Sequence, residues 1–284
     1  MDKDIYTTTM EAAAYNLIDI GRGLIKEGQS LLRRTGRVTI GVVSRWCNDE
    51  MIAPFFLDHY SFADEIVILL SSDTTDKSRE IIAKYPNARV IEFEYPMGRF
   101  NAKEANDIIH QTTDSMVTDW IIAVDADELV FAKGFEDVHE VLATVNGNVV
   151  YTDFWNVYKH RSEMDLDPTL KAVWLRRHGD PNRNADDGRY RKPVVVRSGF
   201  GFRWSIGLHV LYPGPEIRIS KTRLDGAHWR MADPILAIAR RMRGRRENLS
   251  MQDIINQCSS DNFDVTKRDI INECEAHLDD PQLF

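Results

Sequence analysis

The chain has 284 residues, of which 43% are hydrophobic and 28% charged, and its formal net charge is −8. This composition is typical of an ordinary globular protein and excludes disordered, fibrous and collagen-like classes. The acidic balance argues against a generic binder of polyanions. The length suits one large α/β domain with an appendage.

Cysteine usage and the N-terminus bear on the compartment. Cys47, Cys258 and Cys274 have no CxxC or Cys/His spacing, so neither a disulfide framework nor a zinc site is indicated. The first residues are acidic where a signal peptide is basic, and no apolar run is long enough to span a membrane. We expect a cytoplasmic protein, with peripheral binding at the inner membrane surface as a further option.

Apolar residues recur at helical spacing over 10–33 and predict an N-terminal helix outside the main fold. From Arg37 onward, short runs rich in β-branched residues alternate with helical patterns. The runs predict strands at 38–44, 65–71, 88–94 and 120–128, with helices at about 50–60, 75–84 and 102–115. This alternation is typical of βαβ units. We predict an α/β fold, a mostly parallel sheet with helices on both faces.

The pattern becomes less regular after residue 147. Strand-like segments occur at 149–158, 171–177, 190–198 and 202–212, a polar loop at 178–188, and a helical pattern at 232–248. We predict three parts along the chain. They are a helical extension (1–36), a main domain (37–230) with a nucleotide-binding half (37–130) and an acceptor-side half (131–230), and a C-terminal helical segment (231–284).

The sharpest chemical feature is the run Asp125-Ala126-Asp127-Glu128, directly after the apolar residues 121–124. Carboxylates at the end of a buried strand repel one another unless a cation offsets their charge, and hard divalent ions prefer oxygen ligands. The run therefore predicts a bound Mg²⁺ or Mn²⁺. The alternative is that these acids cap the next turn and are solvated.

Several segments, in this order and spacing, resemble one known family. They read VVSRWCNDE (42–50), LLSSDTTDKSREI (69–81), NAKEAND (101–107), WIIAVDADE (120–128), RKPVVVRS (191–198), GLHV (207–210) and DGAHWR (225–230). They are similar to the family 2 glycosyltransferases with the GT-A fold, in the branch whose acidic motif is D-x-D-E. The resemblance covers about residues 38–245 and is more specific in its first half.

The resemblance implies a metal site and a donor site. Asp127 would hold the metal, Asp125 would contact the ribose or a metal-bound water, and His228 would be a downstream ligand. A neutral imidazole favours Mn²⁺ over Mg²⁺, although His228 could equally be a structural residue beside Trp229. The residues expected to bind the nucleotide sugar are Ser44, Asn48, Glu50, Asp73, Arg99, Lys103, Asn106 and Asp125.

The implied reaction transfers a sugar from a nucleoside diphosphate to an acceptor hydroxyl. An inverting displacement needs a base near that hydroxyl. The family usually supplies it from a Glu-Asp pair after the D-x-D motif, and this chain has no clear copy of that pair. The candidate bases are Asp153, in an aromatic strand, and His209.

A basic run lies near the C-terminus, with nine basic and three acidic residues from Arg218 to Glu247, followed by an acidic tail. The basic segment could pair with that tail or be a solvated face. One or two of its arginines could instead close over the donor diphosphate. A third interpretation is that residues 240–246 dock an anionic surface such as lipid, lipopolysaccharide or nucleic acid.

These features predict a metal-dependent glycosyltransferase, with a UDP-sugar as its default donor. The acceptor would be a glycan, a glycolipid or a modified nucleic-acid base. One alternative is a nucleotidyltransferase acting on a sugar phosphate, although the loop SRWCNDE after the first strand lacks the glycine usual there. The other is a noncatalytic binding protein on the same fold.

Overall fold

The computed structural model describes residues 37–95, 100–170, 172–179, 191–212, 216–243, 249 and 264–283. The predicted N-terminal helix and Arg99 lie outside these residues. No helix within the described part of the chain is long and apolar enough to cross a membrane. One large hydrophobic core surrounds a single sheet, and a small second cluster lies under the C-terminal helices.

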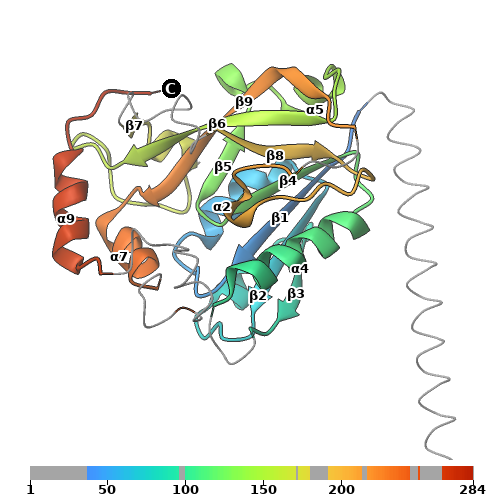
Figure 1. Ribbon diagram of the computed structural model, residues 1–284. Helices are drawn as coiled ribbons and strands as arrows, with labels where there is room; N and C mark the ends of the chain where they lie inside the picture. The colour runs from blue at the N-terminus through green and yellow to red at the C-terminus, as the bar shows by residue number, and fades with distance from the viewer. Residues whose placement is uncertain are drawn as a thin grey trace, which may run out of the picture.

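The strands form one sheet in the order β3-β2-β1-β4-β8-β6-β9-β5, with β7 paired to β6 (Figure 1). Their bounds are β1 Ile40–Trp46, β2 Glu65–Ser71, β3 Ala88–Phe93, β4 Trp120–Asp125, β5 Glu128–Phe131, β6 Val149–Tyr158, β7 His178–Gly179, β8 Arg191–Arg197 and β9 Ile219–Met231. The α-helices are α2 Ala53–His59, α3 Ser78–Ile82, α4 Ala102–Ser115, α5 Val138–Ala143, α6 Ala172–Leu175, α7 Pro234–Arg243 and α9 Lys267–Ala276. Three short 3₁₀ helices are η1 Tyr60–Phe62, η3 Lys133–Phe135 and η5 Ile206–Leu208.

The first half is a parallel βαβ array, as predicted. β1 pairs in parallel with both β2 and β4, and β2 with β3. Right-handed crossovers place α2 and α3 on one face and α4 on the other, because the chain reverses direction across the sheet after β3. Figure 1 shows α4 lying in front of these strands. The predicted α/β fold class is confirmed, and the bounds of β2, α4 and β6 match the predictions.

The second half differs from the prediction in three places. Residues 172–175 are helical rather than extended, and the segment 202–212 contains η5 and a single bridge between Trp204 and Leu211 rather than a strand. The 13-residue strand β9 was not predicted. It pairs in parallel with β6 and antiparallel with β5.

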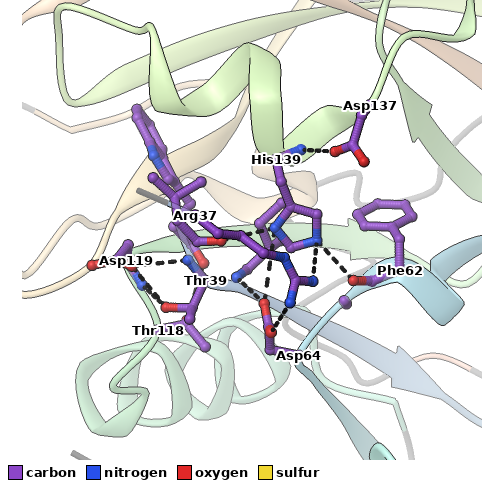
Figure 2. Close-up of polar contacts among 12 residues, drawn as sticks. Arg37, Thr39, Phe62, Asp64, Thr118, Asp119, Asp137 and His139 are labelled. Carbon is purple, nitrogen blue, oxygen red and sulfur yellow. Dashed lines mark hydrogen bonds and ion pairs between the residues drawn. The ribbon is translucent and has the colours of Figure 1, made fainter. Parts of the chain in front are cut away.

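A polar cluster holds the edge of the sheet at which β1 begins (Figure 2). Asp119 accepts hydrogen bonds from the backbone N–H and the hydroxyl of Thr39, at 2.8 and 2.9 Å. The ring nitrogens of the buried His139 lie 2.8 Å from the carbonyl oxygen of Val38 and 2.9 Å from that of Phe62. These contacts tie α5 to the starting edge of the sheet, away from the carboxyl ends of the parallel strands.

The C-terminal helices pack on the end of the sheet. α7 follows β9 almost directly and packs against α9. The second hydrophobic cluster joins them and consists of Tyr158, Met231, Ala237, Ile270 and Cys274. Arg241 on α7 makes an ion pair with Glu273 on α9, at 2.5 Å. The C-terminal segment is therefore docked against the strands that carry the second half of the site.

Candidate functional site

The D-x-D-E run lies at the carboxyl end of the parallel strands. β4 ends at Asp125, the chain turns through Ala126 and Asp127, and β5 begins at Glu128. Asp127 is 5% exposed and Glu128 is 1% exposed. Ligands of open α/β sheets bind beyond this edge, so three carboxylates converge where a ligand is expected.

Two of these carboxylates have internal cationic partners. Lys192 on β8 forms a buried ion pair with Glu128, and its ammonium nitrogen lies 3.9 Å from Asp125 Oδ2. Arg45 on β1 donates to Asp125 Oδ1 at 3.0 Å. Burial alone would raise the pKa of Asp125, but Arg45 and Lys192 outweigh it and lower that pKa. Burial raises the pKa of Glu128 despite the charge on Lys192.

The third carboxylate, Asp127, faces His228 on β9. Asp127 Oδ2 lies 3.6 Å from His228 Nε2, and His228 Nδ1 lies 2.8 Å from Asn156 Oδ1 on β6. Because an amide oxygen only accepts hydrogen bonds, this contact assigns the ring proton to Nδ1. Nε2 then faces Asp127, to which it presents a proton when the ring is doubly protonated and a lone pair when the ring is neutral.

A guanidinium from α7 completes the cluster. Arg240 contacts Asp49 Oδ1 at 2.6 Å and Asp127 Oδ1 at 3.1 Å. Burial would raise the pKa of Asp127, but Arg240 and then His228 oppose it and hold that pKa far below its usual value. Arg240 and Arg241 both make ion pairs within the molecule and are less than one-fifth exposed. They do not offer their charge to an anionic surface, and residues 244–246 lie outside the described part of the chain.

The side-chain atoms of this cluster can be compared with the ligands that a divalent metal ion requires. Within the described residues, no group of three or more His, Cys, Asp or Glu side chains is arranged to hold a metal ion. Two donors do fit, Asp127 Oδ2 and the lone pair of His228 Nε2, with the histidine fixed by Asn156 as metal-binding histidines usually are. A carboxylate and an imidazole are suitable ligands for Mn²⁺. A bound ion would need its remaining ligands from elsewhere, such as phosphate oxygens.

Hydrogen bonds join the loop after β1 to the loop after β2. Asn48 has a positive φ of 53°, and its side-chain oxygen accepts from the backbone N–H groups of Thr75 and Asp76, at 2.8 and 3.2 Å. Glu50 accepts from the backbone N–H of Lys77 at 3.0 Å. These two residues, expected to contact the donor, are therefore used in joining the two loops.

The other expected donor residues differ in their surroundings. Ser44 is fully buried and accepts a hydrogen bond from Trp46 Nε1 at 3.0 Å, whereas Asp73 is exposed at the end of β2. Lys103 is exposed and pairs with Asp107 at 2.6 Å. Asn106 is buried, donates to the carbonyl oxygen of Trp204 at 2.8 Å, and has a side-chain oxygen with no partner in the described structure.

The two candidate bases lie in different places. Asp153 is three residues before Asn156 on β6, so its side chain is on the opposite face from Asn156 and His228. It pairs with Arg191 at 2.9 Å and Arg223 at 3.5 Å. His209 follows η5, which contacts α4, β4 and β8, and it is exposed. The structure thus does not bring Asp153 to the side chains around Asp127.

Sequence reasoning missed Lys192, Arg45 and Asn156, and it did not single out Arg240 from its basic neighbours. Lys192 and Arg45 had a weak signal, since each is a lone cation in or beside an apolar strand run. A buried cation requires a paired anion. Asn156 had no signal of its own, because its role depends on its register with His228.

Comparison with known proteins gives distant structural likenesses. The sequence matches no known family profile and no curated protein. The structure is similar to S. aureus TarS residues 1–349, with 13% identity, a TM-score of 0.42, and 79% of this chain and 70% of that chain covered. It also resembles mannosyl-3-phosphoglycerate synthase from Rubrobacter xylanophilus, with 17% identity, a TM-score of 0.32, and 51% and 48% covered.

A third likeness is to glucosyl-3-phosphoglycerate synthase from Mycobacterium tuberculosis, solved in complex with Mn²⁺, UDP and phosphoglyceric acid. The identity is 18%, the TM-score is 0.29, and 43% of this chain and 44% of that chain are covered. This chain therefore spans less than half the length of either synthase. Such low identities and TM-scores do not transfer an activity to this chain.

Proposed function

We propose that this protein is a metal-dependent glycosyltransferase that moves a sugar from a nucleoside-diphosphate sugar, by default a UDP-sugar, to an acceptor hydroxyl. The observation that carries the proposal is the Asp127–His228 pair, 3.6 Å apart beyond the parallel strands, with Asn156 holding the histidine. This is a donor set for Mn²⁺ or Mg²⁺ at the edge where nucleotides bind α/β sheets.

Each group in the site has a role in this proposal. Asp127 and His228 would hold the metal, whose positive charge would offset the negative charge that develops on the leaving diphosphate. Lys192 and Arg45 hold Glu128 and Asp125 in place, so that Asp125 faces the ribose. Asp73, exposed at the end of β2, accepts hydrogen bonds from the edge of the base.

The base for the acceptor hydroxyl is assigned to His209 in preference to Asp153. His209 belongs to the segment that packs through Trp204 on Asn106 and His110 of α4. Lys192 and Asn156 lie on one face of the sheet, because Thr152 and Lys192 are register partners and Asn156 is four residues after Thr152. Asp153 points to the other face, and two arginines neutralise its charge.

The test is a calorimetric and thermal-shift screen of nucleoside diphosphates, their sugars and nucleoside triphosphates, each with and without Mn²⁺. Ligands that bind only the native state raise its melting temperature. We expect one diphosphate and its sugar to stabilise the protein only with Mn²⁺, and the effect to be lost in Asp127→Asn. The matched control is Asp114→Asn, which removes an exposed pair with Arg203 and leaves binding unchanged.

Two results would contradict the proposal. Binding of a triphosphate alone, with a sugar phosphate as second substrate, would identify a nucleotidyltransferase. No nucleotide binding with metal, in a wild-type protein that melts cooperatively, would leave a noncatalytic binding protein.

A further inference from the structure

Arg240 connects two acids that belong to different parts of the proposed donor site. Asp49 follows β1 and shapes the loop after that strand, since its Oδ2 accepts from the backbone N–H of Cys47 at 2.9 Å. Asp127 follows β4 and is the proposed metal ligand. The guanidinium contacts one oxygen of each, and all three side chains are less than one-fifth exposed.

The two oxygens of Asp127 therefore face different partners. Oδ1 accepts from Arg240 at 3.1 Å, and Oδ2 faces His228 Nε2 at 3.6 Å. A divalent ion bound at Oδ2 would lie beside the guanidinium. Arg240 and a divalent ion together carry more positive charge than Asp49 and Asp127 offset. Like charges repel strongly where solvent is excluded, so Arg240 opposes the metal ion until a further anion binds.

A nucleoside diphosphate supplies that anion. Its phosphate oxygens carry more negative charge than the single carboxylate of Asp127, and a guanidinium binds phosphate through two parallel hydrogen bonds. The helix that carries Arg240 is anchored independently of the site, because Ala237 and Arg241 pack on α9 through Ile270 and Glu273. The side chain of Arg240 can exchange partners while α7 remains docked.

We propose that Arg240 is a charge-exchange residue. In the ligand-free protein it pairs with Asp127 and Asp49, and when metal and donor bind it moves from Asp127 to the donor diphosphate. This inference rests on the proposed function and adds to it a residue that couples metal binding to nucleotide binding. It follows that Arg240 opposes the binding of metal alone and favours the binding of metal together with a diphosphate.

The decisive test is therefore a pair of affinities that change in opposite directions. In Arg240→Gln, Mn²⁺ alone, titrated by the electron paramagnetic resonance signal of free Mn²⁺, should bind at least about fivefold more tightly. UDP in saturating Mn²⁺, titrated by calorimetry, should bind about 10- to 100-fold more weakly, as expected for the loss of charge-assisted hydrogen bonds. The control is Arg89→Gln, which removes an ion pair with Glu65 at the starting edge of the sheet, away from the site, and should leave both affinities unchanged.

The outcomes separate this inference from the proposed function. If the wild-type protein binds no nucleotide with Mn²⁺, the proposed function fails. If it does bind, but Arg240→Gln weakens both affinities or changes neither, the charge-exchange role is wrong. If Arg240→Gln does not fold, Arg240→Lys serves, because an ammonium spans the two acids less well and should shift both affinities in the same opposite directions by smaller factors.

Discussion

His228 Nδ1 and Asn156 Oδ1 lie 2.8 Å apart on two neighbouring parallel strands. The two residues are direct register partners, so the contact is built into the pairing of β6 with β9. It orients the imidazole and fixes the tautomer that leaves Nε2 free to bind a metal. Asn156 is thus a positioning residue that needs no contact with substrate.

Replacing Asn156 should weaken metal binding without removing a ligand. We expect Asn156→Ala to lower the affinity for Mn²⁺ by about 10- to 100-fold, the usual cost of losing a group that orients a metal-bound histidine. Titration of Mn²⁺ in the presence of UDP measures it. Asn156→Asp, which keeps an acceptor oxygen, should restore most of the affinity. An unchanged affinity in Asn156→Ala would show that Asn156 does not position a metal ligand.

Lys192 and Glu128 should stabilise the protein as a unit. Lys192→Met leaves Glu128 as an uncompensated charge that is 1% exposed, which costs about 3–5 kcal/mol in the free energy of unfolding. The double variant Lys192→Met/Glu128→Gln should lose less than the Lys192→Met single variant, because no buried charge is left alone. Urea unfolding of the wild type, the two single variants Lys192→Met and Glu128→Gln, and the double variant gives the coupling energy between the two side chains. Additive losses would contradict the pairing.

The two candidate bases can be separated by kinetics. We expect His209→Ala to lower donor hydrolysis or sugar transfer by at least about 100-fold, as for removal of a general base, with the affinity for UDP and Mn²⁺ unchanged. Asp153→Asn should leave the rate within about threefold, because its carboxylate is paired with Arg191 and Arg223. Loss of turnover in Asp153→Asn with normal donor binding would make Asp153 the base.

Cys47 provides a chemical probe of nucleotide binding beside the loop that follows β1. It lies between β1 and the loop that carries Asn48 and Asp49, so UDP with Mn²⁺ should slow its alkylation. Cys274 is the internal reference, because burial and the charge of Glu273 raise the pKa of its thiol to about 11. At pH 8 only about one thiol in a thousand would be ionised, so Cys274 should react slowly with or without nucleotide. Peptide mapping by mass spectrometry follows each cysteine separately.

The polar cluster around His139 should affect stability alone. A neutral ring has one N–H, so His139→Leu removes one hydrogen bond to the carbonyl group of Val38 or Phe62, and leaving that acceptor unsatisfied costs about 1–3 kcal/mol. The melting temperature should fall while the affinity for UDP and Mn²⁺ stays constant. A fall in that affinity would mean that the starting edge of the sheet influences the opposite edge.

The elements that the sequence predicted well have strong local patterns. β2 and β6 are continuous runs of apolar and aromatic residues, and α4 begins at Asn101, whose side chain caps the helix by accepting from the backbone N–H of Glu104 at 3.2 Å. β9 has no such pattern, because polar residues such as Lys221, Arg223 and Asp225 interrupt it. It is extended because β6 and β5 pair with it on both sides.

The site residues, too, could be predicted only where a local sequence pattern marks them. Asp125 and Asp127 were predicted because they follow an apolar strand directly, which is a local feature. Their cationic partners come from far along the chain. Lys192 is 64 residues from Glu128, and Arg240 is 191 residues from Asp49. No local pattern marks such pairs, since they depend on the order of strands in the sheet and on where α7 docks.

The distance along the chain between Arg240 and Asp49 also bears on how the protein is made. During synthesis, the strands that carry Asp49 and Asp127 emerge long before α7. Until then both carboxylates lack the guanidinium that neutralises them in the finished structure, and burying them would be costly. The parallel half can form its apolar sheet early, but its acidic edge must stay hydrated until the last fifth of the chain arrives. The acidic edge of the ligand site is therefore completed only after α7 has been synthesised.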